Sequence, residues 1–286
     1  MAPNGGTSVA DAVSLYSQRC EPTLGEFPSS VAYSPRLKIA CVINGGTKPP
    51  TNHTRPIDPS RQQYDPSRRS PNTISDIVFN PSQSALFVTI KGTPSTNTPG
   101  TIYIYPVENG TISTTPIISR PELFLNFSLT FLDSDSRTFI TGPAFGAAFL
   151  SISPSYEATV TKKLTFAGQG TIGAIYWSVF SPRFKTIFLL DAMLSPITTV
   201  DAHTGTATGT TPQRLDQNGS FDSAASLEGQ YLYVLKHSAR VNVLDLDPLG
   251  VGESPVEVQS LDLSMFGARV GWQGMALYTS KDFGED

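Results

Sequence analysis

Runs of apolar residues recur along the chain in pairs, and a short polar turn separates the two members of each pair. Each copy has an apolar-aromatic stretch, a turn that often contains Ser or Asn followed by Pro, and then a β-rich run. Such a copy predicts two antiparallel strands around a tight turn, where the missing N–H of proline costs no ladder hydrogen bond. The copies are VAYSPRLKIACVIN (31–44), IVFNPSQSALFVTI (77–90), LTFLDSDSRTFIT (129–141), SVFSPRFKTIFLLD (178–191), SAASLEGQYLYVLK (223–236) and the half-copy GMALYTS (274–280).

The aromatic position of each copy measures the repeat. It falls at Tyr33, Phe79, Phe131, Phe180, the equivalent Ala225, and Tyr278, which gives spacings of 46, 52, 49, 45 and 53. A period in the forties to fifties, with strands in each unit, is typical of a β-propeller. The pattern therefore predicts an all-β fold, and no long amphipathic helical pattern competes with it.

Further short strands between the copies bring each unit to four strands, A to D, as in a propeller blade. They are predicted at 101–105, 147–152, 197–201 and 241–246. A C-type strand at 12–17 and an A-type strand at 275–279 would together form a closing blade shared by both ends of the chain. We predict one propeller domain over residues 1–286, with six blades and seven as the alternative. Residues 47–72, rich in Pro and Arg, are expected to form a long loop or lid.

The composition removes several classes of protein. Only 15% of the residues are charged, hydrophobic residues make up 39%, and the net charge is −4. A chain without a basic surface is not expected to bind nucleic acid, and no apolar run is long enough to span a membrane. Residues 1–6 lack the basic and apolar regions of a signal peptide, so the chain as given is expected in the cytoplasm. A trimmed, mature form of a secreted protein is the alternative.

Several phrases of the sequence point to a known family. They are NGG (44–46), NTISDIVFNPSQSALFVTIKG (72–92), SPRFKTIFLLDA (181–192) and GWQGMALY (271–278). Over about residues 10–280 the chain resembles the fungal 3-carboxymuconate cyclase-like β-propeller proteins, relatives of the lactonase-type propellers. The resemblance implies a ring-forming reaction. Similar-looking fungal propellers serve secondary metabolism as pericyclases, which join a quinone methide to a terpene alkene by a hetero-Diels–Alder step.

Motifs of other chemistries are missing from the sequence. It contains no GxSxG, HExxH, P-loop or strand-following GxGxxG sequence, and its three histidines are not at metal-ligand spacing. We therefore expect neither a metal nor a cofactor.

Propeller geometry gathers the D–A and B–C connections at one end of the blades, which we call the mouth. Predicted mouth residues that bind substrate include aromatic side chains suited to a flat conjugated molecule, together with His53 of the possible lid. The aromatic ones are Phe27, Phe124, Tyr176, Trp177, Phe221 and Trp272. Packing between blades is the alternative role for these rings.

Polar side chains at the predicted mouth are few. Arg269 is suited to holding a carboxylate or acidic oxygen, Lys91 to stabilising negative charge, and His237 to proton transfer. These three are the candidate catalytic residues, and Asp191 and Gln273 are further candidates for substrate binding.

Three functions remain open from the sequence. The first is a cofactor-independent ring-forming enzyme, best described as a pericyclase that orients its reactants in an aromatic site. The second is a lactonising cyclase for carboxymuconate-like acids, which would need more Arg and Lys than the mouth offers. The third is a propeller that binds partners without catalysis. The expected partner is a small polyketide, terpenoid or muconate-like molecule, and an unprotected edge in the closing blade makes a homodimer a further hypothesis.

Overall fold

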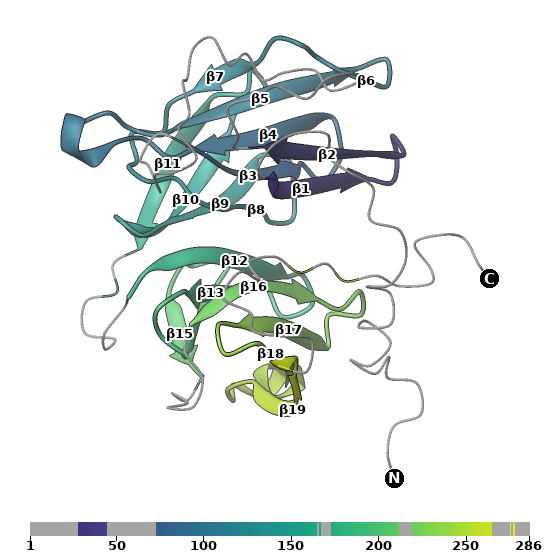
Figure 1. The fold of residues 1–286 in the computed structure, drawn as a ribbon, viewed down its shortest axis with the longest axis vertical. Helices are drawn as coiled ribbons and strands as arrows, with labels where there is room; N and C mark the ends of the chain where they lie inside the picture. Colours follow the sequence, from purple (N-terminus) through teal and green to yellow (C-terminus); the bar gives the residue numbers. More distant parts are fainter. Residues whose placement is uncertain are drawn as a thin grey trace.

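The structure is a computed structural model, and it describes residues 28–44, 73–164, 166, 173–211, 219–264, 275 and 277. Within these residues the chain forms consecutive antiparallel sheets, each built from a stretch that is contiguous in sequence (Figure 1). Two short 3-10 helices, Pro94–Thr96 and Asp247–Val251, complete the regular structure. The predicted all-β fold is confirmed.

Each predicted strand pair is present as a hairpin that opens a sheet. The hairpin strands are β1 (Pro28–Ser34) and β2 (Ile39–Asn44), β3 (Ile74–Phe79) and β4 (Ala85–Ile90), β8 (Leu129–Phe131) and β9 (Arg137–Gly142), β12 (Ile175–Ser181) and β13 (Thr186–Asp191), and β16 (Ser220–Ala225) and β17 (Tyr231–Lys236).

Third and fourth strands complete four of these sheets, and the third strands lie in the places that the sequence predicts. They are β5 (Thr101–Glu108) and β7 (Ile117–Ser119), β10 (Gly146–Ile152) and β11 (Ala158–Leu164), β14 (Ile197–Asp201) and β15 (Ala207–Thr210), and β18 (Arg240–Asp245) and β19 (Val256–Asp262). The two-residue strand β6 (Thr111–Ile112) also pairs with β5. We number the blades 1 to 5 in chain order, and blade 1 is represented by β1 and β2 alone.

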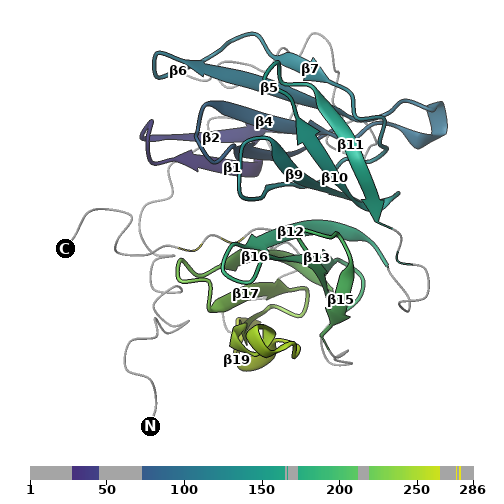
Figure 2. The same cartoon turned by 180° about the vertical axis from the view of Figure 1, so that it is seen from behind.

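The blades stand side by side in chain order, with their first strands toward the middle. Inner strands contact one another in the sequence β1, β3, β8, β12 and β16. Outer strands such as β11, β15 and β19 lie at the periphery, and Figure 2 shows the same order from the opposite side. The number of blades in the ring stays a prediction.

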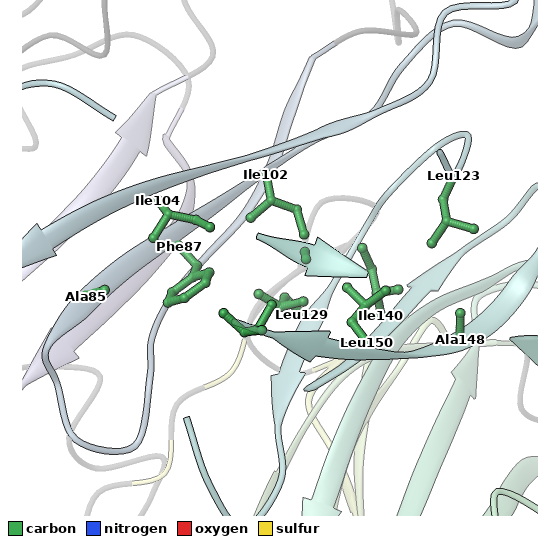
Figure 3. Packing of buried hydrophobic residues seen from close by; sticks show 11 residues of the cluster. Ala85, Phe87, Ile102, Ile104, Leu123, Leu129, Ile140, Ala148 and Leu150 are labelled. Atoms are coloured by element: carbon green, nitrogen blue, oxygen red, sulfur yellow. The ribbon is translucent and has the colours of Figure 1, made fainter. Parts of the chain in front are cut away.

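Hydrophobic cores lie between the blades. One core joins Phe87 and Ile104 of blade 2 to Leu129, Ile140 and Leu150 of blade 3 (Figure 3). Three others join blades 1 and 2, blades 3 and 4, and blades 4 and 5. Both faces of a sheet are therefore buried by its neighbours, as the fully buried strands β4 and β13 show.

The predicted closing blade is described only at its start. Met275 and Leu277 pack beside Tyr233 and Val243 of blade 5. The predicted strand at 12–17 and the loop at 47–72 lie outside the described residues. No helix in the described part of the chain has the length and apolar character needed to cross a membrane.

We expect the substitution Phe87→Ala to lower the free energy of unfolding by about 3–5 kcal/mol, because it leaves a cavity between two sheets. Phe87 is 1% exposed, and its ring lies 4.9 Å from that of Phe131. Urea denaturation followed by circular dichroism measures the change. The control Val251→Ala, at a side chain that is 77% exposed, should shift stability by less than about 0.5 kcal/mol. Equal effects of the two substitutions would contradict the packing described.

Candidate functional site

Phe127 is the centre of an aromatic cluster at the mouth. Its ring centroid lies 4.4 Å from that of Tyr176 and 4.8 Å from that of Trp177. The Lys91 Nζ atom lies over the same ring, 4.5 Å from its centroid. We call Lys91, Phe127, Tyr176 and Trp177 the mouth cluster. It brings together three of the predicted site residues, through a fourth that the sequence analysis did not name.

The two predicted neighbours Tyr176 and Trp177 differ in role. Trp177 packs against the core between blades 4 and 5, together with Phe188 and Leu232. Tyr176 belongs to none of the core clusters and is half-buried. A β-bulge places it: Ile175 pairs with Asp191 and Trp177 with Leu190, so Tyr176 is the unpaired extra residue. Bulges of this kind re-aim a side chain at the edge of a sheet.

Lys91 follows directly after β4 and is half-buried. Its backbone N–H donates to the Thr73 carbonyl, which fixes the start of its side chain at the mouth. Burial lowers the pKa of the Lys91 amine to about 8, because removing the ammonium from water disfavours its charged form. The amine is therefore still cationic at neutral pH, and it lies against an aromatic face that stabilises a cation.

Phe221 and His237 form a second contact at the mouth. The Phe221 ring lies 4.8 Å from the His237 imidazole. Phe221 is the unpaired residue of a bulge in β16, between the pairs Ser220 with Lys236 and Asp222 with Leu235. His237 follows β17 and is exposed. Its imidazole is accessible for proton transfer.

Asp191 holds two mouth loops in place. Its carboxylate accepts hydrogen bonds from the backbone N–H groups of Gly173 and Ala174 on one side, and of Met193 and Leu194 on the other. The side chain is 6% exposed. The Asp191 carboxylate therefore stabilises the two loops. The side chain that the second loop exposes to solvent is Met193.

The remaining predicted site residues are not part of these contacts. Phe124 lies half-buried in the connection before β8, and its ring is not among those stacked at the mouth cluster. Predictions at five further positions lie outside the described residues, namely Phe27, His53, Arg269, Trp272 and Gln273.

Two carboxyl groups that the sequence analysis did not single out occupy matching places on inner strands. Asp76 of β3 accepts from the Leu129 N–H of the next blade at 3.1 Å and from the Ser30 hydroxyl of the previous one at 3.0 Å. Asp222 of β16 accepts from the Met275 N–H at 2.6 Å. Asp76 therefore joins β3 to the next inner strand, β8, and Asp222 joins β16 to the backbone at Met275.

Both carboxyl groups are acids of unusually weak strength. Burial raises the pKa of Asp76 to about 6 and that of Asp222 to about 6, and the charge of Asp76 adds to the shift at Asp222. Hydrogen bonds from backbone N–H groups oppose the shift without cancelling it. Among the described residues, no group of three or more His, Cys, Asp or Glu side chains is placed to hold a metal ion.

The missed residues carry a signal in the repeat. Phe127, Tyr176 and Phe221 each stand four residues before the aromatic position of their blade, at Phe131, Phe180 and Ala225. Asp76 and Asp222 each stand three residues before it. Extending the repeat alignment by four residues toward the N-terminus would have placed all of them.

Comparison with known proteins supports the fold. No protein family matches the sequence, and no curated protein does. Among solved structures, the chain is similar to a periplasmic gluconolactonase of Pseudomonas aeruginosa, with a TM-score of 0.55 and 19% identity. The match covers 73% of this chain and 62% of the gluconolactonase chain, less than two thirds of it. This likeness confirms the β-propeller fold, and membership of the fungal cyclase-like family stays a prediction.

We expect the protein to be more stable at pH 5 than at pH 7.5. A carboxyl group whose pKa rises on folding, from about 3.9 when unfolded, contributes stability that is complete below pH 4. That contribution is lost as the pH rises through the folded value of about 6. The thermal midpoint should therefore fall by a few degrees between the two pH values, as differential scanning calorimetry would measure.

A matched pair of variants assigns this effect. Asp222→Asn should remove a large part of the pH dependence, because the amide has no proton to lose. Asp201→Asn is the control, because the pKa of Asp201 is lowered by hydrogen bonds from Thr204 and its contribution is lost only at more acid pH. An unchanged pH slope in Asp222→Asn would contradict the assignment.

Lys91 should react with acetic anhydride much faster than an ordinary surface lysine at pH 8. At that pH, about half of an amine with a pKa of about 8 is in the neutral, reactive form. For a lysine with the ordinary pKa of about 10.4, the neutral fraction is below about 1%. We expect at least about tenfold faster labelling than at the exposed Lys163, measured by peptide mass spectrometry after a short exposure. Slower labelling at Lys91 would show that its amine is not in the state described.

Proposed function

We propose that the protein is a cofactor-independent enzyme that closes a ring in a small conjugated substrate, in the manner of a hetero-Diels–Alderase. One observation carries the proposal: a single ammonium group, Lys91, lies over the ring of Phe127, which itself contacts Tyr176 and Trp177 of the next blade. A pericyclic reaction needs its reactants held in a reactive pose and one donor to polarise the oxygen-bearing diene. The mouth cluster offers both.

The roles within the cluster follow from its geometry. Phe127 and Tyr176 are half-buried and outside the core, so the open parts of their rings are suited to contact a flat heterodiene. Lys91 would donate to the oxygen on which negative charge develops as the ring closes. Trp177 packs against blade 5 and makes an edge-to-face contact with the ring of Phe127. This division of roles lets the protein accelerate ring closure without transferring a proton.

Lactone formation or opening is the second candidate, and a different observation favours it. Asp76 and Asp222 have pKa values of about 6, so either carboxyl group could supply or accept a proton near neutral pH. One solved structure with a similar fold is a periplasmic gluconolactonase. A muconate-like substrate would, however, need several cations, and Lys91 is the one cation that the described mouth cluster contains.

The proposed function also bears on the cellular compartment and on the partner. A small-molecule enzyme of this kind would work in the cytoplasm, on a polyketide or terpenoid partner. A trimmed form of a secreted protein remains the alternative, and a homodimer remains a hypothesis that light scattering would test.

A ring-closure assay tests the proposal. The purified protein is incubated with an aromatic quinone-methide precursor and a cyclic sesquiterpene alkene, and the adduct is followed by liquid chromatography and mass spectrometry. We expect faster closure than in buffer and an excess of one stereoisomer. Lys91→Met should slow closure about tenfold to hundredfold, in line with the loss of one charge-stabilising donor.

Matched controls separate the readings. Lys163→Met removes an exposed lysine of β11 and should leave the rate unchanged. Muconate-type acids run in parallel report lactone formation. If no substrate set reacts and none raises the thermal midpoint, the enzyme proposal fails and a partner-binding propeller takes its place.

A further inference from the structure

The inner strands share a bulge at the same place near the mouth. In β1, β12 and β16 the pairing skips one residue, which is Ser29, Tyr176 or Phe221. In β3 the pairing skips between Ile74 and Ile77. The skipped residue of each of these strands, counted at Ser75 for β3, stands four positions before the aromatic position of its blade. In blades 1, 2, 4 and 5 the repeat thus leaves one residue outside the strand pairing.

Blade 3 places Phe127 at the same position. Phe127 precedes β8 by two residues, and its N–H donates to the Thr141 carbonyl. In blade order, the residues at this sequence position are Ser29, Ser75, Phe127, Tyr176 and Phe221. The aromatic side chains come from three consecutive blades, and serines stand in the first two.

The three aromatic residues lie outside the hydrophobic cores between the blades. Phe127, Tyr176 and Phe221 are half-buried, and none belongs to a hydrophobic core between blades. Rings that are partly open to solvent and set at equivalent points of adjacent blades form a row along the mouth. We call these three residues the aromatic row. Partly exposed aromatic surface of this kind marks a place where a ligand binds.

A basic side chain stands at each end of the aromatic row. Lys91, from blade 2, lies over the ring of Phe127. His237, from blade 5, lies against the ring of Phe221. Tyr176 stands between these ends and contacts Phe127. The row therefore has a cationic end at blade 2 and an imidazole end at blade 5, which could either donate or accept a hydrogen bond.

We propose that the aromatic row binds a planar conjugated molecule lengthwise, with an acidic oxygen at Lys91 and a hydroxyl or carbonyl group at His237. The proposal rests on the proposed function and names the substrate class and its orientation. An anion belongs at the Lys91 end because, among the described residues, the ammonium group contacts the ring of Phe127 and no carboxylate. The ligand should be planar because the aromatic row consists of flat rings from three consecutive blades.

A set of naphthalene ligands tests the orientation directly. The probes are 6-hydroxy-2-naphthoic acid, its methyl ester, and 2-naphthoic acid, which respectively carry both end groups, lack the charge, and lack the hydroxyl. Binding is measured by isothermal titration calorimetry at pH 7. We expect the wild-type protein to bind the hydroxy acid at least tenfold more tightly than either of the other two.

Substitution at each end should remove one preference and spare the other. In Lys91→Met the acid and the ester should bind equally, while the preference for the hydroxyl group remains. In His237→Phe the hydroxyl preference should vanish, while the acid is still preferred over the ester. Tyr176→Leu should weaken all three ligands by a similar factor, and Lys163→Met should change nothing. Lys91→Gln replaces Lys91→Met if the latter does not fold.

The outcomes are separable from those of the ring-closure assay. If Lys91→Met weakens the acid and the ester alike, or if the wild-type protein binds none of the probes, the proposed orientation is wrong. If the preferences change as expected but no ring closes, the aromatic row binds ligands and the proposed reaction is wrong. Ring closure with unchanged preferences would retain the reaction and overturn the orientation.

Discussion

The burial of each sheet between its two neighbours is the interaction on which the rest of the structure depends. A four-stranded sheet has two apolar faces and cannot hide both by itself. Successive blades solve this by sharing cores, so that Phe87 of blade 2 and Leu150 of blade 3 belong to one cluster, and Phe139 of blade 3 and Leu189 of blade 4 to the next. Once every sheet must face its neighbours, the chain has to advance around an axis, and its inner strands converge.

That arrangement separates the work of stability from the work of binding. The middle strands, such as β4 and β13, are buried throughout and hold the blades together. At the mouth, where the second strands β13 and β17 end, polar contacts replace apolar ones. Asp191 ties two loops by four backbone hydrogen bonds, and Lys236 ties blade 5 to the Ser195 carbonyl of blade 4. These hydrogen bonds hold the backbone of the mouth in place without depending on the neighbouring side chains.

Much of the fold could be predicted from the sequence, because a repeat reports its own period. The strand pairs around Pro35, Pro81 and Pro182 all form where the pattern places them. Among site residues, Lys91, Tyr176 and Trp177 do meet, since blade geometry brings strand ends of one kind to one place.

Other parts of the site could not be predicted in the same way. Residue type does not reveal that backbone N–H groups occupy the acceptor positions of the Asp191 carboxylate. Those contacts depend on how two loops fold around the side chain. Phe127 precedes its strand and breaks no pattern, so it is visible only when blades are aligned with one another. His53 and Arg269 lie where no copy of the repeat supplies a position.

The repeated bulge has a consequence for how such a protein changes over generations. An unpaired residue can be exchanged without loss of a ladder hydrogen bond, and one that lies outside the core can be exchanged without leaving a cavity. When a blade is duplicated, its bulge is copied with it, and the ring gains a new position that is open to variation at once. Single substitutions at positions such as Tyr176 and Phe221 can therefore change the side chains at the mouth while the cores between the blades stay intact.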